Sequence, residues 1–108
     1  MKNHYYEDIY EITRLIPVGN VSTYGAIADY LALGSARMVG RALSQCNLSG
    51  NGDIPAHRVT NRIGELTGRG KFKPPSLMRK LLESEGVKVK NHRVVDFKLL
   101  FWHPGEHL

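Results

Sequence analysis

Two helix-forming stretches joined by a short turn, between residues 22 and 46, constrain the fold of this chain more than any other feature. Ser22 or Thr23 can cap the first helix, because a side-chain oxygen at that position accepts a hydrogen bond from a free amide of the first turn. Gly34 then follows the end of this helix, and Ser35 is placed to cap a second helix over about residues 36–46. The residues that the first helix turns toward a core are Ile27, Ala28 and Leu31.

The second helix has two chemically distinct faces. Its apolar face consists of Val39, Ala42, Leu43 and Cys46. Its polar face consists of Arg37, Arg41 and Gln45, which are spaced four residues apart. Two helices joined by a glycine-containing turn, the second with a basic outer face, are typical of a helix-turn-helix that binds DNA. An ordinary helical hairpin with a basic surface is the alternative that this pattern leaves open.

The positive charge of the chain is concentrated in one segment. The 108 residues carry 15 basic and 10 acidic side chains, a net charge of +5. Residues 57–93 alone hold 10 of the basic and 3 of the acidic side chains. Such clustering suits contact with phosphate groups, so we expect an anionic partner, with a plainly solvated surface as the alternative.

The remaining patterns predict a mainly α-helical fold with a short β hairpin or wing, formed as one domain over residues 1–108. Apolar residues at helical spacing indicate an N-terminal helix, and they are Tyr5, Ile9, Ile12 and Ile16. A further helix is expected over about residues 76–85, with Leu77, Leu81 and Leu82 toward the core.

Three segments after residue 56 are expected to be extended or to pack as a tail. Residues 57–60 and 63–66 flank Asn61-Arg62 and are expected to pair as a small hairpin. Residues 87–90 alternate in polarity like an exposed strand or wing. The apolar tail of residues 94–102 is expected to dock on the core, with Trp102 as a packing residue.

Several other kinds of site find little support in the sequence. The five histidines lack metal-ligand spacing, and the basic, glycine-rich loop of residues 67–73 lacks the patterns of a nucleotide-binding loop, so we expect no metal and no cofactor. Cys46 is expected to be a buried structural residue rather than a reactive thiol. The lack of a long apolar run predicts no membrane contact, and we expect a cytoplasmic monomer, associated with the nucleoid or nuclear in a eukaryote.

A series of short motifs between residues 16 and 86 carries a family resemblance. The motifs are Ile16-Pro17-Val18-Gly19, Val21-Ser22-Thr23-Tyr24-Gly25, Ala36-Arg37-Met38-Val39-Gly40, Asn47, Pro55-Ala56-His57-Arg58-Val59, Gly64-Glu65-Leu66 and Leu81-Leu82-Glu83-Ser84-Glu85-Gly86. In order and spacing they resemble the C-terminal DNA-binding domain of the O6-alkylguanine-DNA alkyltransferases. The resemblance implies the winged helix-turn-helix-like fold of that domain and a DNA partner.

The resemblance also implies a site that lacks its nucleophile. In that family a cysteine takes the alkyl group from a flipped guanine, after a histidine, a water and a glutamate have generated the thiolate. Ala56 stands at the cysteine position here, while His57, Glu85 and Asn47 match the rest of the network. We therefore expect no catalytic residue and no transfer reaction, because a methyl group cannot accept an alkyl group.

Residue 69 distinguishes between branches of the family. Arg69 stands where the alkyltransferases have a tyrosine. Alanine at position 56 together with arginine at position 69 resembles the alkyltransferase-like proteins, which are non-enzymatic relatives. That resemblance implies recognition of O6-alkylguanine in double-stranded DNA and transfer of the lesion to nucleotide excision repair proteins.

The implied mechanism assigns residues to two groups. The helix-turn-helix would dock in the minor groove, Arg37 would fill the gap left by the flipped base, and Tyr24 would help to rotate the nucleotide. The expected DNA-binding residues are Tyr24, Arg37, Arg41, Gln45 and Lys71. The expected lesion pocket consists of Tyr24, Ala56, His57, Val59 and Arg69, where Arg69 would lie against the base as a cation–π partner.

Two alternatives remain open from the sequence. One is an active alkyltransferase in which Ala56 was introduced to replace the cysteine, although Arg69 argues against it. The other is a winged-helix transcription regulator that reads DNA sequence through the major groove, which would leave the motif around Ala56 unexplained.

Overall fold

The computed structural model describes residues 5–46 and 53–108, and within them it is mainly helical. The first half contains α1 (Tyr5–Arg14), β1 (Ser22–Thr23), α2 (Tyr24–Tyr30) and α3 (Ala36–Ser44). The second half contains two 3-10 helices, η1 (Ala56–Arg58) and η2 (Thr67–Lys71), with β2 (Val59–Thr60), α4 (Leu77–Ser84), β3 (Val89–Lys90), β4 (Arg93–Val94), α5 (Phe97–Leu100) and α6 (Pro104–His107).

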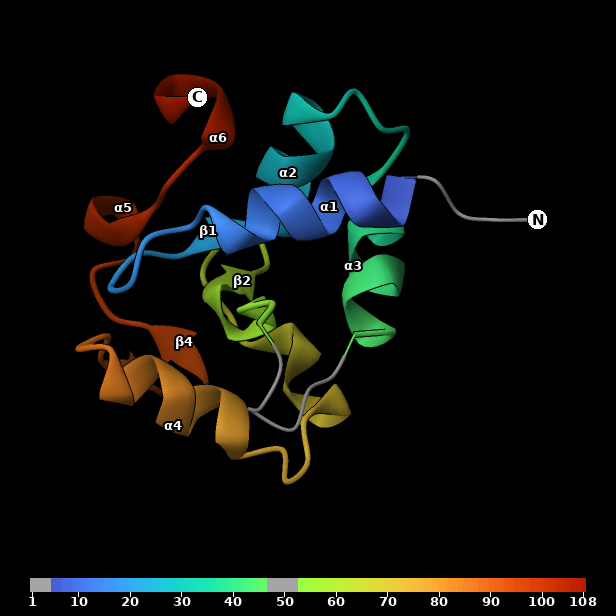
Figure 1. Cartoon of the computed structure of the whole chain (residues 1–108). Helices are drawn as coiled ribbons and strands as arrows, with labels where there is room; N and C mark the ends of the chain where they lie inside the picture. Colours follow the sequence, from blue (N-terminus) through green and yellow to red (C-terminus); the bar gives the residue numbers. More distant parts are fainter. Residues whose placement is uncertain (1–4, 47–52) are drawn as a thin grey trace.

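One part of the core lies where α1 packs on α2 and α3 (Figure 1), and it continues to β2, α4 and Trp102. Ile9, Ile12 and Ile16 are buried there, which confirms the amphipathic N-terminal helix. Each fully buried side chain of this size stabilises the fold by about 2 kcal/mol. The helix of residues 5–14 therefore holds the helix-turn-helix pair in place from one side.

The helix-turn-helix predicted between residues 22 and 46 is present as α2 and α3. Thr23 is the N-cap of α2, since its Oγ1 accepts a hydrogen bond from the amide of Ala26 at 3.0 Å. Ser35 precedes α3 without a capping hydrogen bond from its side chain. Val39, Ala42 and Leu43 are buried as predicted, whereas Cys46 lies beyond the end of α3 and is only half-buried.

The prediction that residues 57–60 and 63–66 pair as a small hairpin is wrong. Val59 and Thr60 instead pair in parallel with Ser22 and Thr23. The turn that follows is closed by Asn61, whose Oδ1 accepts hydrogen bonds from the amides of Ile63 (3.1 Å) and Glu65 (2.8 Å). The parallel pairing matters for function because it holds η1, and with it Ala56, beside the start of α2.

The wing expected near residues 87–90 is confirmed as the antiparallel pair of β3 and β4. Asn91 and His92 connect the strands with φ angles of 51° and 61°, and a two-residue type I′ turn requires positive φ at both of these positions. Two strands of two residues each make a small wing, which packs beside α4 (Figure 1).

The C-terminal tail docks on the core as predicted. The amide of Val21 donates to the carbonyl of Leu100 at 3.0 Å, and the amide of Trp102 donates to the carbonyl of Val21 at 2.8 Å. Trp102 is buried, and its ring stacks on that of His107 with ring centres 5.6 Å apart.

In α4 the fully buried residues are Met78 and Leu82, while Leu77 and Leu81 are half-buried. The face of α4 that packs on the core is therefore rotated slightly from the predicted one.

Candidate nucleic-acid interface and base pocket

Ala56 occupies a fixed position at the start of η1. Its amide donates to the carbonyl of Ile54 at 2.8 Å, and the amide of Arg58 donates to the carbonyl of Pro55 at 2.9 Å. Pro55 has φ near −79°, which its ring restricts to this region. Only 6% of Ala56 is exposed, and that small area faces a cavity.

The cavity over Ala56 has a volume of about 190 Å³ and is open on one side. An apolar cavity of about 150 Å³ is large enough to take up benzene. The cavity over Ala56 therefore has room for a planar ring, and its open side leaves space for a larger group to extend outward. The lining residues come from α2, α3, η1, η2 and the residue after η2, and they are Tyr24, Gly40, Leu43, Ser44, Ala56, Thr67, Gly68, Lys71 and Phe72.

Tyr24 forms one wall of this cavity, and two glycines, Gly40 and Gly68, lie beside its side chain. A Cβ atom added at Gly40 would lie 3.9 Å from the Tyr24 ring, an ordinary contact. A Cβ atom added at Gly68 would lie only 2.6 Å from the Tyr24 hydroxyl, so a larger residue there would have to displace the Tyr24 side chain. Burial raises the pKa of the Tyr24 phenol, and a hydrogen bond with Thr67 offsets part of the rise.

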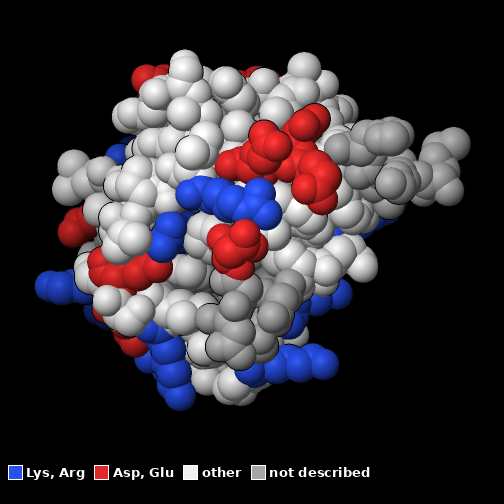
Figure 2. Space-filling view, in the orientation of Figure 1, with Lys and Arg blue, Asp and Glu red and all other residues white. Residues whose placement is uncertain are grey.

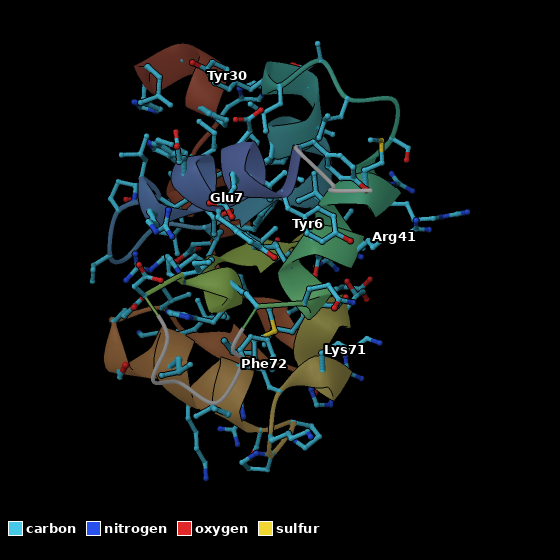
Figure 3. The ribbon with its side chains drawn as sticks, turned by 45° about the vertical axis from the view of Figure 1, so that its right-hand side comes forward. Tyr6, Glu7, Tyr30, Arg41, Lys71 and Phe72 are labelled. Carbon is cyan, nitrogen blue, oxygen red and sulfur yellow. The ribbon has the colours of Figure 1, made fainter. Side chains whose placement is uncertain are left out.

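A wider basic groove of about 540 Å³ adjoins the cavity. It shares Tyr24, Gly40, Ser44 and Lys71 with the cavity and adds Ala36, Arg37 and Arg41 from α3. Figure 3 shows Arg41 and Lys71 on the same side of the molecule, one from α3 and one from η2. Three cationic side chains thus surround the entrance to a mostly apolar cavity.

Behind Ala56 lies a hydrogen-bonded network of three charged or titratable side chains. Nε2 of His57 lies 2.8 Å from Oε2 of Glu85. Arg58 binds both oxygens of the same carboxylate, with Nε 2.9 Å from Oε1 and Nη2 2.7 Å from Oε2. The remaining nitrogen of Arg58, Nη1, donates to the carbonyl of Ile16 at 2.8 Å. The network ties η1 to the end of α4 and to the segment after α1.

The two pKa shifts in this network have identifiable causes. Burial lowers the pKa of His57, and the interaction with Glu85 opposes that shift without cancelling it. Burial alone would raise the pKa of Glu85, but hydrogen bonds from Arg58 and His57 outweigh it and lower that pKa. The Glu85 carboxylate is therefore ionised, and its hydrogen bonds with His57 and Arg58 join η1 to the end of α4.

The structure brings some of the predicted site residues together and separates others. Tyr24, Ala56 and Lys71 line the cavity, and Arg37 and Arg41 line the adjoining groove. His57 and Val59 follow Ala56 closely in the sequence and are buried, but neither lines the cavity. Gln45 is exposed at the end of α3 and lines neither space.

Arg69 and Asn47 require separate comment. Arg69 is half-buried and donates from Nη1 to the carbonyl of Leu66 at 2.9 Å, so its guanidinium points back to its own turn rather than lining the cavity. Asn47 lies outside the residues that the structure describes.

Two functional residues were not found from the sequence. Arg58 was part of the motif, but its binding of Glu85 joins residues separated by 27 positions, and no local pattern predicts that. Gly68 was included only in a glycine-rich loop. Its particular contact with Tyr24 depends on packing between two distant segments.

The described ranges, 5–46 and 53–108, contain no group of three or more histidine, cysteine, aspartate or glutamate side chains placed to hold a metal ion. Among the helices of the same ranges, none is long and apolar enough to span a membrane.

Fold and site together define a small winged helix-turn-helix-like domain with an open cavity beside its second helix. The chain belongs to the family described as 6-O-methylguanine DNA methyltransferase, DNA binding domain, whose family model matches residues 4–87.

Individual relatives cover nearly the whole chain. Alkyltransferase-like protein 1 of Schizosaccharomyces pombe is 34% identical over 107 residues, covering 94% of this chain and 97% of the relative. The DNA base-flipping protein of Vibrio parahaemolyticus is 34% identical over 97 residues, covering 89% and 93% respectively. The crystal structure of S. pombe Atl1 in complex with damaged DNA containing O6-carboxymethylguanine matches with a TM-score of 0.83 and 29% identity, over 94% of this chain and 97% of that one.

Proposed function

We propose that this protein recognises O6-alkylguanine in double-stranded DNA by flipping the base into the cavity over Ala56, without transferring the alkyl group. The observation that carries the proposal is the position of the cavity, directly beside the basic groove of Arg37, Arg41 and Lys71. The groove supplies phosphate contacts that do not depend on sequence, and the cavity supplies a place for one extrahelical base. The relatives named for base flipping and for binding damaged DNA support the same assignment.

Each step of recognition has a physical basis in the chain. Flipping a base costs a few kcal/mol, and less for a weakly paired base such as O6-alkylguanine, so the lesion is favoured before any pocket contact forms. The methyl group of Ala56 leaves room for the alkyl substituent and offers it no nucleophile. Arg37 extends from the first turn of α3 at the edge of the groove, where it can fill the gap in the base stack. The bound complex would then be handed to nucleotide excision repair.

The proposal is tested by equilibrium binding to two duplexes that differ only in one O6-methylguanine, at one stated salt concentration, with the product strand analysed by mass. We expect clearly tighter binding to the lesion and a methyl group that stays on the base. Equal affinity for both duplexes would refute lesion recognition, and loss of the methyl group would refute the non-enzymatic assignment. A defined sequence preference on undamaged DNA would favour the winged-helix regulator instead.

A further inference from the structure

A second groove lies on the side of the molecule that carries the wing. It encloses about 450 Å³ between the turn after β2 and the segment from β4 to α5. None of its lining residues lines the cavity over Ala56 or the basic groove. Figure 1 shows α5 and β4 on the left and α3 on the right. The residues that line this wing groove include Arg62, Ile63, Arg93, Asp96, Phe97, Lys98 and Leu99.

The walls of the wing groove are held together by the protein's own hydrogen bonds. Nε of Arg93 donates to the carbonyl of Ile63 at 3.0 Å, and the amide of Val94 donates to the carbonyl of Gly64 at 2.9 Å. Gly64 has φ near +85°, and a Cβ atom added there would lie 2.9 Å from the Phe97 ring. The ring thus rests directly on the glycine backbone. A groove that is already formed needs little ordering when a ligand binds.

The wing groove exposes apolar side chains that the core does not use. Leu99 is 80% exposed and Ile63 is 37% exposed. In α5, Leu99 is therefore presented to solvent, whereas the following residue, Leu100, is half-buried. Exposed apolar side chains gathered at one groove are characteristic of protein-binding sites.

The charge around the wing groove indicates what kind of segment fits it. Arg62, Arg93 and Lys98 are exposed, while Asp96 is the one acidic residue among those lining the groove. A partner with acidic side chains would be attracted to this edge, and its apolar side chains would cover Leu99 and Ile63. Nucleic acid fits less well, because phosphates gain nothing from an exposed leucine and isoleucine.

We propose that the wing groove binds an acidic peptide segment of a partner protein, anchored by leucine or phenylalanine side chains. The inference rests on the proposed function in one respect, since the partner would be the protein that receives the recognised lesion. The binding step itself requires no lesion. The groove and the base cavity have no residue in common, so both can be occupied at the same time.

The first test uses the full chain labelled with nitrogen-15 and a short synthetic peptide in which leucine and phenylalanine alternate with aspartate and glutamate. Backbone amide shifts are expected at Gly64, Arg93 and Leu99. A peptide of the same design with lysine and arginine is expected to cause none. No shifts at the highest soluble concentration of the acidic peptide, or equal shifts with both peptides, would overturn the proposal. Shifts of these amides on adding an undamaged duplex would assign the groove to nucleic acid instead.

The second test uses variants with a matched control. Leu99→Ser and Lys98→Glu are each expected to weaken binding of the acidic peptide by about tenfold, since each removes an anchor or reverses a charge. Val18 is also exposed, at 65%, and lies outside the groove, so Val18→Ser should leave binding unchanged. Equal affinity of all three variants would overturn the proposal.

The same variants separate this inference from the proposed function. Leu99→Ser is expected to keep the wild-type preference for the O6-methylguanine duplex, because Leu99 lies outside the cavity and the basic groove. Loss of peptide binding with intact lesion preference supports two independent sites. A protein that binds the peptide but shows no lesion preference would refute the proposed function alone.

Discussion

Tyr24 is positioned by the absence of a side chain at residue 68. Its hydroxyl occupies the space that any Cβ at Gly68 would need, at 2.6 Å. Real Cβ atoms do not approach an oxygen this closely, so a substitution at residue 68 must displace the phenol. The wall of the cavity therefore depends on Gly68 although this residue has no functional group.

Gly68→Ala is expected to weaken binding to the O6-methylguanine duplex by about tenfold, because the displaced Tyr24 ring narrows the cavity. Gly70 provides the matched control, since it lies in the same 3-10 helix and a Cβ added there meets no atom within 4 Å. Fluorescence anisotropy with both variants measures the effect. Equal affinity of Gly68→Ala and Gly70→Ala would show that the position of Tyr24 does not matter.

Arg37 and Arg41 are one helical turn apart on α3, and their roles are expected to differ. Arg37→Ala should reduce the ratio of lesion to undamaged affinity, because no side chain then fills the gap left by the flipped base. Arg41→Ala should weaken both affinities about equally, as the loss of a phosphate contact does. Competition binding with the two duplexes measures the ratio, and the same ratio in both variants would rule out the special role of Arg37.

The motif residues were predictable because the motif is local, whereas their partners were not. Ala56, Tyr24 and Lys71 were assigned from short motifs and loops, and the structure places all three on one cavity. Arg58 and Glu85 are separated by 27 positions, and a single sequence does not show that their side chains meet. Arg69 was expected in the pocket, but a hydrogen bond to Leu66 turns its guanidinium back to its own turn.

At the scale of elements, the end of α4 and η1 are joined through one carboxylate. The side chains of Glu85 and Arg58 are only 14% and 13% exposed. Removal of either side chain would therefore leave the charge of the other one buried without its partner. Breaking such a pair costs about 3–5 kcal/mol. Glu83, two residues earlier, pairs with Arg79 at 3.1 Å, with side chains 42% and 43% exposed.

Glu85→Gln is therefore expected to lower the free energy of unfolding by about 3 kcal/mol. Glu83→Gln is expected to change it by less than about 1 kcal/mol, because exposed ion pairs contribute little. Urea unfolding followed by circular dichroism compares the two. If both variants lost the same stability, the network behind Ala56 would not be what fixes η1.

The same network predicts how stability depends on pH. The pKa of His57 is lowered on folding, so the unfolded chain binds a proton first as the pH falls below the ordinary histidine value of about 6.5. The pKa of Glu85 is also lowered, so its contribution is present above the ordinary glutamate value of about 4.3 and is lost as the pH falls further. Both groups make the folded state less stable in acid.

We expect the melting temperature to fall progressively between about pH 7 and pH 3, first through the range in which His57 protonates in the unfolded chain and then through that of Glu85. Glu85→Gln should lose less stability than the wild type below about pH 4.3, since the variant has no carboxylate to protonate. Thermal unfolding by circular dichroism at constant ionic strength measures both curves. Parallel curves for wild type and variant would place the pH dependence elsewhere.

Helices were easier to predict than strands, for a physical reason. Apolar residues three and four positions apart predict α1, α2, α3 and α4, and each of these helices lies where it was expected. The partner of β2 is β1, which lies before α2, so the local sequence around residues 57–66 favoured a hairpin that does not form. For the wing, the alternation of residues 87–90 predicts a strand, but its partner β4 was not identified from the sequence.

Charge is distributed unevenly over the whole molecule. Figure 2 shows acidic side chains gathered over α1, where Glu7, Asp8 and Glu11 are exposed, with lysine and arginine beside them and projecting from the left, lower and right-hand edges. The acidic cluster disfavours phosphate at that part of the surface, whereas Arg37, Arg41 and Lys71 favour it beside α3 and η2. Under the proposed function, this charge would orient the domain on DNA before a base is flipped.

This orientation makes the salt dependence of binding a test of where DNA lies. Each phosphate neutralised by a lysine or arginine contributes about −0.9 to the slope of log K against log salt concentration. Lys71→Ala is expected to reduce the magnitude of that slope by about 0.9, because Lys71 stands at the entrance of both the groove and the cavity. Anisotropy titrations with an undamaged duplex at several salt concentrations give the slope.

Lys98→Ala is the matched control for that measurement, because it removes an exposed lysine from the wing groove rather than from the side of α3. Its slope is expected to equal that of the wild type. A reduced slope for Lys98→Ala would mean that bound DNA reaches the wing groove, which would then be unavailable to a peptide. Unchanged slopes for both variants would mean that phosphate is held elsewhere on the surface. Only a change confined to Lys71→Ala agrees with DNA on one side of the molecule and a free protein-binding groove on the other.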